Sequence, residues 1–276
     1  VAGLDLLGAT TDRGNNGPLA DWFFGQTEFA LQSGTVHWTD DLRQQPPVTL
    51  ADVDLVVRNP GRRHLLRLDA TPPAELGQRF TLQGVFTSPF WSLHPGRWQQ
   101  WSGTAHANLP SVDMARLAVP AALAERFGLG VQQGVGALRL WVDLAQGQPT
   151  GGTADLALTQ VQARFAQANE PLALARLQGR VNVGLKAQTL SLDTEGLAFD
   201  TVQGTQWAQG DLSLKLTQHT DHTLGELRAS RINLGALHEL SNGLPLSPPE
   251  QARLAQLNPR GELTALKLTW RSEETG

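Results

Sequence analysis

The best spacing for a metal site occurs in the segment His219-Thr220-Asp221-His222. Imidazole and carboxylate groups are common zinc ligands, so these three side chains have the right chemistry. The segment lies between a predicted strand and a Thr-Leu-Gly turn, where exposed polar residues are expected for structural reasons alone. We therefore predict no metal site and no cofactor.

Glycoside hydrolysis is the second chemistry to consider, because Asp40 and Asp41 follow Trp38 closely. That reaction needs two carboxyl groups about 5–10 Å apart, and nothing in the sequence places a partner at such a separation. A solvated hairpin turn is the simpler interpretation. The remaining histidines, at positions 37, 64, 94, 106 and 238, occur singly. The motifs of serine hydrolases, phosphate-binding loops, dinucleotide-binding folds and zinc proteases are absent, so we predict that the chain is not an enzyme.

Composition excludes further classes of function. The 276-residue chain has a formal net charge of −4 and no cysteine. It cannot form disulfides, thiolate metal sites or a cysteine nucleophile. Nucleic acid is not expected as a partner, since proteins that bind it present a basic face. No apolar run reaches the roughly 18 residues of a transmembrane helix, and Val1 is neither an initiator methionine nor part of a signal sequence. We expect a piece of a longer protein.

The elements that could position a site are strands, because apolar residues recur at every second position. In the clearest stretch Leu138, Leu140 and Val142 share one face, while Arg139 and Trp141 point the other way. The same alternation recurs at Leu156 and Leu158, at Val181 and Val183, and at Leu212, Leu214 and Leu216. Turn sequences such as Asn59-Pro60-Gly61 separate the stretches. About twelve to fifteen strands in antiparallel order are expected, so the predicted fold is mainly β with a few short helices.

Three short helices are predicted. Ser247-Pro248-Pro249-Glu250 has the pattern of a capping box and begins a helix over 247–257. Helices near 112–127 and 232–242 would start at the potential caps Asp113 and Asn233. These two sites lie 120 residues apart and indicate a weak internal duplication. We predict a first β unit over 1–127, a second over 128–246, and a last part, 247–276, with the third helix and the start of another strand set.

Several runs resemble the YhdP family of the AsmA-like superfamily, large envelope proteins of Gram-negative bacteria. One is Ser33-Gly34-Thr35-Val36-His37-Trp38-Thr39-Asp40-Asp41, and the others are residues 50–55, 59–64, 70–77, 101–103, 112–117 and 257–263, in family order. The resemblance implies a central segment of a protein that is anchored in the inner membrane and extends through the periplasm. It also implies a long, twisted and curled antiparallel sheet with an open apolar groove that moves phospholipid toward the outer membrane.

The leading hypothesis is therefore a non-enzymatic lipid conduit segment. Its partners would be phospholipid acyl chains, the rest of the parent chain, and proteins of the inner and outer membranes. The candidate groove residues are Leu138, Leu140, Val142, Leu156, Leu158, Val181, Val183, Leu212, Leu214 and Leu216. One alternative is a periplasmic scaffold or assembly factor for outer-membrane biogenesis, which would have a filled sheet interior. Another is a carbohydrate-binding sandwich that uses the tryptophans with Asp40 and Asp41.

Overall fold

The computed structural model describes residues 18–40, 45–92, 94–117, 124, 127–246 and 248–273. The strands are β1 (Glu28–Asp40), β2 (Gln45–Arg58), β3 (Arg63–Thr71), β4 (Phe80–Thr87), β5 (Ser102–Asp113), β6 (Gly130–Ala145), β7 (Gln148–Arg164), β8 (Leu172–Lys186), β9 (Thr189–Thr201), β10 (Gln206–Gly210), β11 (Leu212–Gln218), β12 (His222–Asn233) and β13 (Glu262–Glu273). The helices are α1 (Pro18–Gly25), α3 (Leu234–Leu240) and α4 (Pro248–Leu257), with short 3-10 turns η1 (Trp98–Gln100), η2 (Met114–Arg116) and η3 (Ser241–Gly243).

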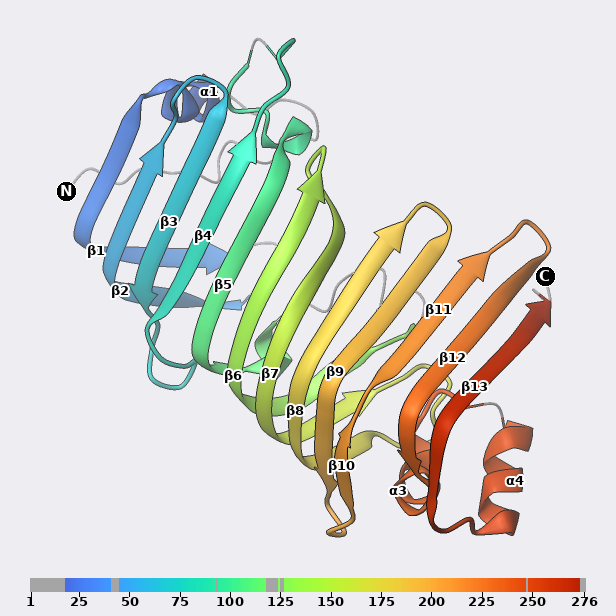
Figure 1. Ribbon diagram of the computed structural model, residues 1–276. Helices are drawn as coiled ribbons and strands as arrows, with labels where there is room; N and C mark the ends of the chain where they lie inside the picture. Colours follow the sequence, from blue (N-terminus) through green and yellow to red (C-terminus); the bar gives the residue numbers. More distant parts are fainter. Residues whose placement is uncertain are drawn as a thin grey trace. The chain divides into compact units, whose positions relative to one another are not determined.

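All thirteen strands join one antiparallel sheet (Figure 1). Neighbours follow chain order from β1 to β9 and then from β11 to β13, while β10 pairs with β9. Among the described residues β1 and β13 do not pair with each other, so the sheet is open. The prediction of a mainly β, antiparallel, open sheet with a few short helices is confirmed.

The chain divides into two compact units. Unit 1 contains residues 1–109 and 140–150, and unit 2 contains residues 110–139 and 151–276. Strands β5, β6 and β7 therefore contribute residues to both units. These units are not the repeats 1–127, 128–246 and 247–276, which remain a prediction.

Unit 1 has a small buried core in which α1 contacts the sheet. Trp101 stacks on His64 with ring centroids 3.8 Å apart, and Phe24 of α1 meets the Trp101 ring edge to face at 4.8 Å. Val53 and Val57 of β2 are further buried residues of unit 1. These contacts fix the position of α1, since burial of large aromatic side chains is strongly stabilising.

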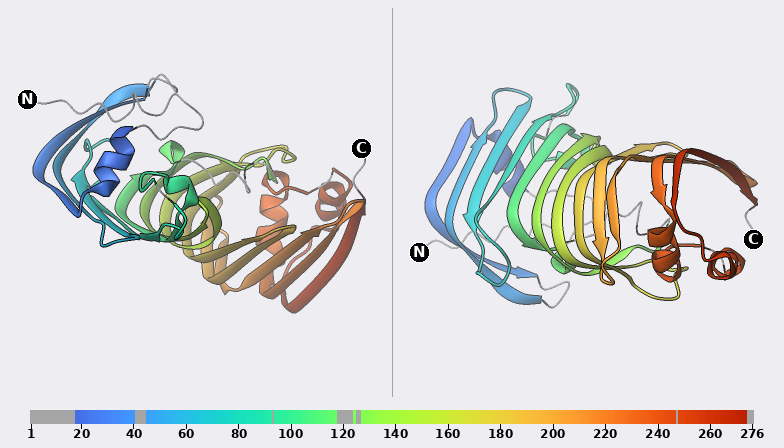
Figure 2. Two further views of the ribbon diagram at one scale, coloured as in Figure 1. Left: turned by 90° about the horizontal axis from the view of Figure 1, so that it is seen from above. Right: turned by 60° about the horizontal axis from the view of Figure 1, so that its bottom comes forward.

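Strands β7, β8 and β9 each have an irregularity in the part that belongs to unit 2. Gln160 in β7 has a φ of 53°, and Gly196 in β9 has a φ of 60°. The register of β8 against β9 shifts between Leu174 and Arg176, and again between Gln178 and Arg180. Bulges bend a strand and increase its twist, and β8 and β9 bend in Figures 1 and 2.

The bulges change the phase of the apolar pattern. In β7 the apolar residues before Gln160, such as Leu158, have even numbers. Val161, directly after Gln160, has an odd number. Leu158 lies opposite Leu177 and Val161 opposite Leu174, and Leu158, Val161 and Leu174 form one buried cluster. The extra residue thus keeps apolar side chains on one face through the bend.

Helices cover part of this face in unit 2. Asn233 begins α3, and its side chain accepts a hydrogen bond from the Ala236 N–H at 3.1 Å. Ala236 is fully buried against Ile232 and Trp207. Figure 2 shows α3 and α4 on the same side of strands β11 to β13. Near α3, the face of the sheet that carries the apolar side chains is therefore covered by the protein itself.

The sequence predicts helices near 112–127, near 232–242 and over 247–257. Within 232–242 the structure has α3 followed by η3, and within 247–257 it has α4. Ser247, the predicted cap of α4, lies outside the described residues. At the start of the range 112–127 the structure has η2, and the Asp113 side chain accepts from the Ala115 N–H at 3.0 Å. Residues 118–123, 125 and 126 of that predicted helix lie outside the described residues. None of the helices described here is long and apolar enough to cross a bilayer.

Candidate functional site

An aliphatic ladder crosses five strands of unit 2. Val183 of β8 lies opposite Leu192 of β9, which lies opposite Leu214 of β11. Leu214 in turn lies opposite Leu227 of β12, and Leu227 lies opposite Leu268 of β13. Because directly paired residues of antiparallel strands point to the same face, these five side chains form one continuous apolar row.

Two further rows flank this ladder on the same face. One runs from Leu185 through Leu190 and Leu216 to Gly225, where Trp270 of β13 lies opposite the glycine. A side chain on Gly225 would collide with the Trp270 ring, so glycine makes room for the indole. The other row contains Ala154 with Val181 on β7 and β8, and Leu212 with Ala229 and Leu266 on β11 to β13. We call these three rows the apolar face of unit 2.

The opposite face of the same strands is polar and carries ion pairs. Asp155, Arg180 and Glu195 form a row across β7, β8 and β9, with Arg180 Nε 2.6 Å from Asp155 Oδ1. The hydrogen bond from Arg180 holds the pKa of Asp155 below its ordinary value. On β12 the hydrogen bond from Arg228 lowers the pKa of Glu226 in the same way. These carboxylates stay charged at neutral pH and keep this face hydrated.

The predicted site residues fall into two groups. Seven of them belong to strands of unit 2 and lie on one face according to the strand pairing: Leu156, Leu158, Val181, Val183, Leu212, Leu214 and Leu216. Leu138 also belongs to unit 2 and lies two residues after Gly136, whose backbone faces Leu158. Leu140 and Val142 belong to unit 1. The structure therefore brings eight of the ten candidates into one unit.

Exposure differs along the face. Leu138, Leu158 and Leu216 are buried, and the other seven candidates are half-buried. Leu156 packs against the cluster of Leu158, Val161 and Leu174, and Leu212 packs against the cluster around Ala236. Val183 and Leu214 belong to neither cluster. Two residues of the central ladder thus lie outside both buried clusters.

Sequence reasoning missed several members of the face. Leu192 and Leu190 alternate on β9 in the same way as the chosen residues, so their signal was present. Leu227 and Leu268 lie on strands in which charged residues alternate with them. Val161 follows the irregularity at Gln160 and Leu174 precedes the first register shift of β8, so simple alternation assigns both to the wrong face.

The candidate metal segment does not form a metal site in the described structure. The rings of His219 and His222 stack with centroids 4.6 Å apart. Asp221 Oδ1 lies 2.6 Å from His222 Nδ1, and Asp221 also pairs with Arg271 at 3.4 Å. Among the described residues no group of three His, Cys, Asp or Glu side chains could hold a metal ion. The turn predicted at Asp40 and Asp41 falls largely outside the described residues.

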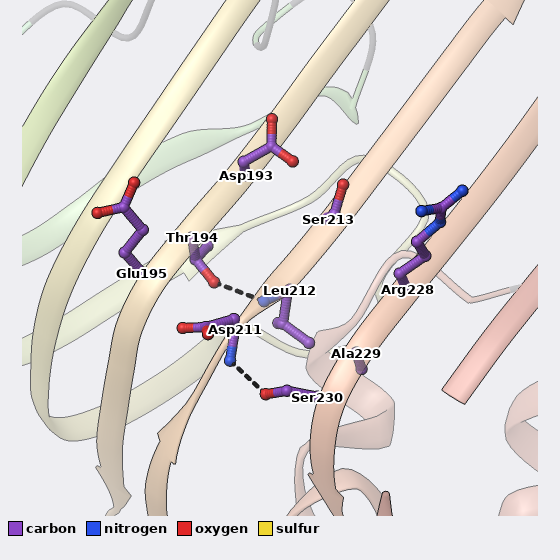
Figure 3. Close-up of a pocket in the computed structure, with 9 residues that line it drawn as sticks. All are labelled: Asp193, Thr194, Glu195, Asp211, Leu212, Ser213, Arg228, Ala229 and Ser230. Carbon is purple, nitrogen blue, oxygen red and sulfur yellow. Dashed lines mark hydrogen bonds between the residues drawn. The ribbon is translucent and has the colours of Figure 1, made fainter. Parts of the chain in front are cut away.

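A separate hollow of about 330 Å³ lies at the junction of β10 and β11, between β9 and β12 (Figure 3). The Leu212 N–H donates to Thr194 Oγ1 at 2.9 Å, and the Asp211 N–H donates to Ser230 Oγ at 2.8 Å. These two side-chain oxygens accept from backbone N–H groups in place of the carbonyl oxygens of a neighbouring strand. The lining includes Asp193, Ser213 and Arg228 of the polar face, beside Leu212 and Ala229 of the apolar face.

Comparison with known families identifies the chain. The family model described as YhdP protein matches residues 4–275, nearly the whole sequence. No curated protein and no solved structure gives a match. The family match agrees with the open antiparallel sheet and with the order of the sequence runs noted above. The chain belongs to the YhdP family, a family of envelope proteins.

Proposed function

We propose that this chain is a segment of a bridge-like lipid transfer protein that carries phospholipid acyl chains across the periplasm between the inner and outer membranes. The parent protein would be anchored in the inner membrane, and proteins of both membranes would be its partners. The segment would bind lipid without catalysing a reaction.

The observation that supports this proposal is the ladder of Val183, Leu192, Leu214, Leu227 and Leu268. An acyl chain of about sixteen carbons costs about 12 kcal/mol in water, at about 0.8 kcal/mol per methylene. A row of aliphatic side chains that runs across strands offers similar contacts at every strand. A lipid can then move along the row without one strongly preferred position.

The polar face supports the same function from the other side of the sheet. Asp155, Arg180 and Glu195 keep that surface in water, so only one face of each strand is available for hydrocarbon. Phospholipid head groups would stay hydrated outside the apolar face. Such binding selects for acyl chains and is weakly selective for head groups.

The test is the lipid content of a charged variant. Leu214→Glu places a carboxylate in the central ladder, away from both buried clusters. We expect at least a fivefold loss of co-purified phospholipid, measured by mass spectrometry of the 276-residue chain, because a charge in an apolar site is costly.

Ala157→Glu is the matched control. Ala157 is exposed, lies opposite Gln178 on the polar face, and has Arg180 and Arg176 on the neighbouring strand. This variant should retain the lipid of the unmodified chain. Equal lipid in both variants, with both folded by circular dichroism, would contradict the proposal.

A scaffold function is the second candidate. The edges of β1 and β13 that no described strand covers favour it, since unpaired strand edges can bind another protein by strand addition. The same purification distinguishes lipid transfer from a scaffold function. A scaffold would retain a protein instead of a lipid, and Leu214→Glu would not change what is retained.

A further inference from the structure

A cluster of exposed aromatic side chains lies in the loop between β4 and β5 of unit 1. Phe90 is 78 % exposed, Trp91 is 64 % exposed and Trp98 is 52 % exposed. The rings of Phe90 and Trp91 meet edge to face with centroids 4.8 Å apart. Trp101, at the end of the same loop, is only 5 % exposed because it stacks on His64. The loop thus buries one tryptophan and leaves three aromatic rings in solvent.

Hydrogen bonds hold this loop in a defined position. The Gly96 N–H donates to Asp21 Oδ1 of α1 at 2.9 Å, and His94 Nδ1 lies 2.9 Å from Asp21 Oδ2. At the other side the Ser88 N–H donates to the Arg62 carbonyl oxygen in the turn between β2 and β3 at 2.9 Å. Figure 1 shows the loop extending past the end of β4. The aromatic rings are therefore presented on an ordered support.

Three arginines share this end of unit 1. Arg62 belongs to the β2–β3 turn, Arg63 is the first residue of β3, Arg97 belongs to the loop, and all three are exposed. No Asp or Glu occurs from residue 55 to 68 or from 86 to 112. Within the described part of the chain, no carboxylate lies at ion-pair distance from these guanidinium groups. Asp21, which is bonded to Gly96 and His94, adds one negative charge here, so the three arginines still leave this end positive in a chain whose net charge is −4.

We propose that Phe90, Trp91, Trp98, Arg62, Arg63 and Arg97, the aromatic–basic tip, bind the surface of a bilayer that contains anionic lipids. Tryptophan favours the boundary between head groups and acyl chains. Arginines near an anionic membrane surface are attracted to it. Together they match the two signals that stable surface attachment requires, apolar insertion and positive charge. This binding goes beyond the proposed lipid transfer and does not depend on it.

Vesicle flotation tests the proposal with the 276-residue chain. The chain should float with vesicles of phosphatidylcholine and phosphatidylglycerol, and much less with phosphatidylcholine alone or in high salt. Phe90→Ser combined with Trp91→Ser should reduce the bound fraction at least tenfold. Arg63→Gln combined with Arg97→Gln should weaken binding about 25-fold, at about fivefold per arginine.

Matched controls come from unit 2. Leu257→Ser changes a side chain that is 74 % exposed on α4, and Arg164→Gln removes an exposed arginine of β7. Both should bind vesicles like the unmodified chain. Leu214→Glu should also keep vesicle binding, which separates the tip from the apolar face. The proposal is overturned if the unmodified chain does not float, if the tip variants float equally well, or if the tip retains a protein and no vesicles.

Discussion

At the scale of single residues, His64 is the most constrained titratable group of unit 1. Asn59 Nδ2 donates to the Gln26 carbonyl oxygen, so Asn59 Oδ1 must accept from His64 Nδ1–H at 2.8 Å. The proton therefore sits on Nδ1, and the bare Nε2 is buried without a partner among the described residues. Burial lowers the pKa of His64 from 6.5 to about 4. A neutral imidazole is thus part of the folded core.

This environment predicts a loss of stability in acid. The unfolded chain protonates His64 below about pH 6.5 and the folded chain only near pH 4, so the unfolded state binds more protons between these values. The free energy of unfolding should fall as the pH drops from 6.5 to 4, by on the order of 3 kcal/mol from this residue. Urea denaturation at a series of pH values measures this decrease in the free energy of unfolding.

His64→Phe is the comparison, because phenylalanine keeps a ring against Trp101 and cannot titrate. Its free energy of unfolding should be lower at pH 7, since Asn59 Oδ1 loses its donor. The free energy of unfolding of His64→Phe should nevertheless change less between pH 6.5 and 4 than that of the unmodified chain. An identical pH slope in the two proteins would show that His64 is not the group responsible.

At the scale of elements, the bulges decide which side chains reach the apolar face, and the Gln160 backbone is central to the one in β7. A φ of 53° costs a residue with a Cβ about 1–2 kcal/mol, and more when it is β-branched. Gln160→Val should therefore be less stable than Gln160→Gly by about 1–2 kcal/mol in urea denaturation.

Thr159 provides the internal control, since it precedes the bulge and pairs regularly with Arg176. In an ordinary strand position valine is favoured over glycine by about 0.5–1 kcal/mol. The order of the two variants should thus reverse between positions 159 and 160. The same order at both positions would mean that the bulge does not form in solution.

The bulges also explain how much of the site could be predicted from sequence. Alternation on regular strands placed Val183 and Leu214 correctly on one face, because each lies in a stretch without a bulge. It could not place Val161 or Leu174, since one extra residue reverses the phase. The Asn233 cap could be predicted from a local rule. The His64 cluster could not, because it joins α1, β3 and the end of the β4–β5 loop, which are far apart in sequence.

At the scale of the whole molecule, the open sheet has two long edge strands. β1 and β13 stand at the ends of the hydrogen-bonding order, each with one edge that no described strand covers. Leu268 and Trp270 on β13 are 47 % and 41 % exposed, so this edge is apolar as well as unpaired. Exposed edges of this kind pair with other strands.

We therefore expect the 276-residue chain to self-associate with increasing concentration in sedimentation velocity experiments. Leu268→Lys should shift the distribution toward monomer, because an inward-pointing lysine on an edge strand opposes pairing with another sheet. Thr269→Lys adds the same charge to the polar face, opposite Glu226, and should leave association unchanged. If both variants associate like the unmodified chain, the contacts form elsewhere. If only Leu268→Lys is monomeric, the apolar side of the β13 edge is the surface on which a further strand would be added.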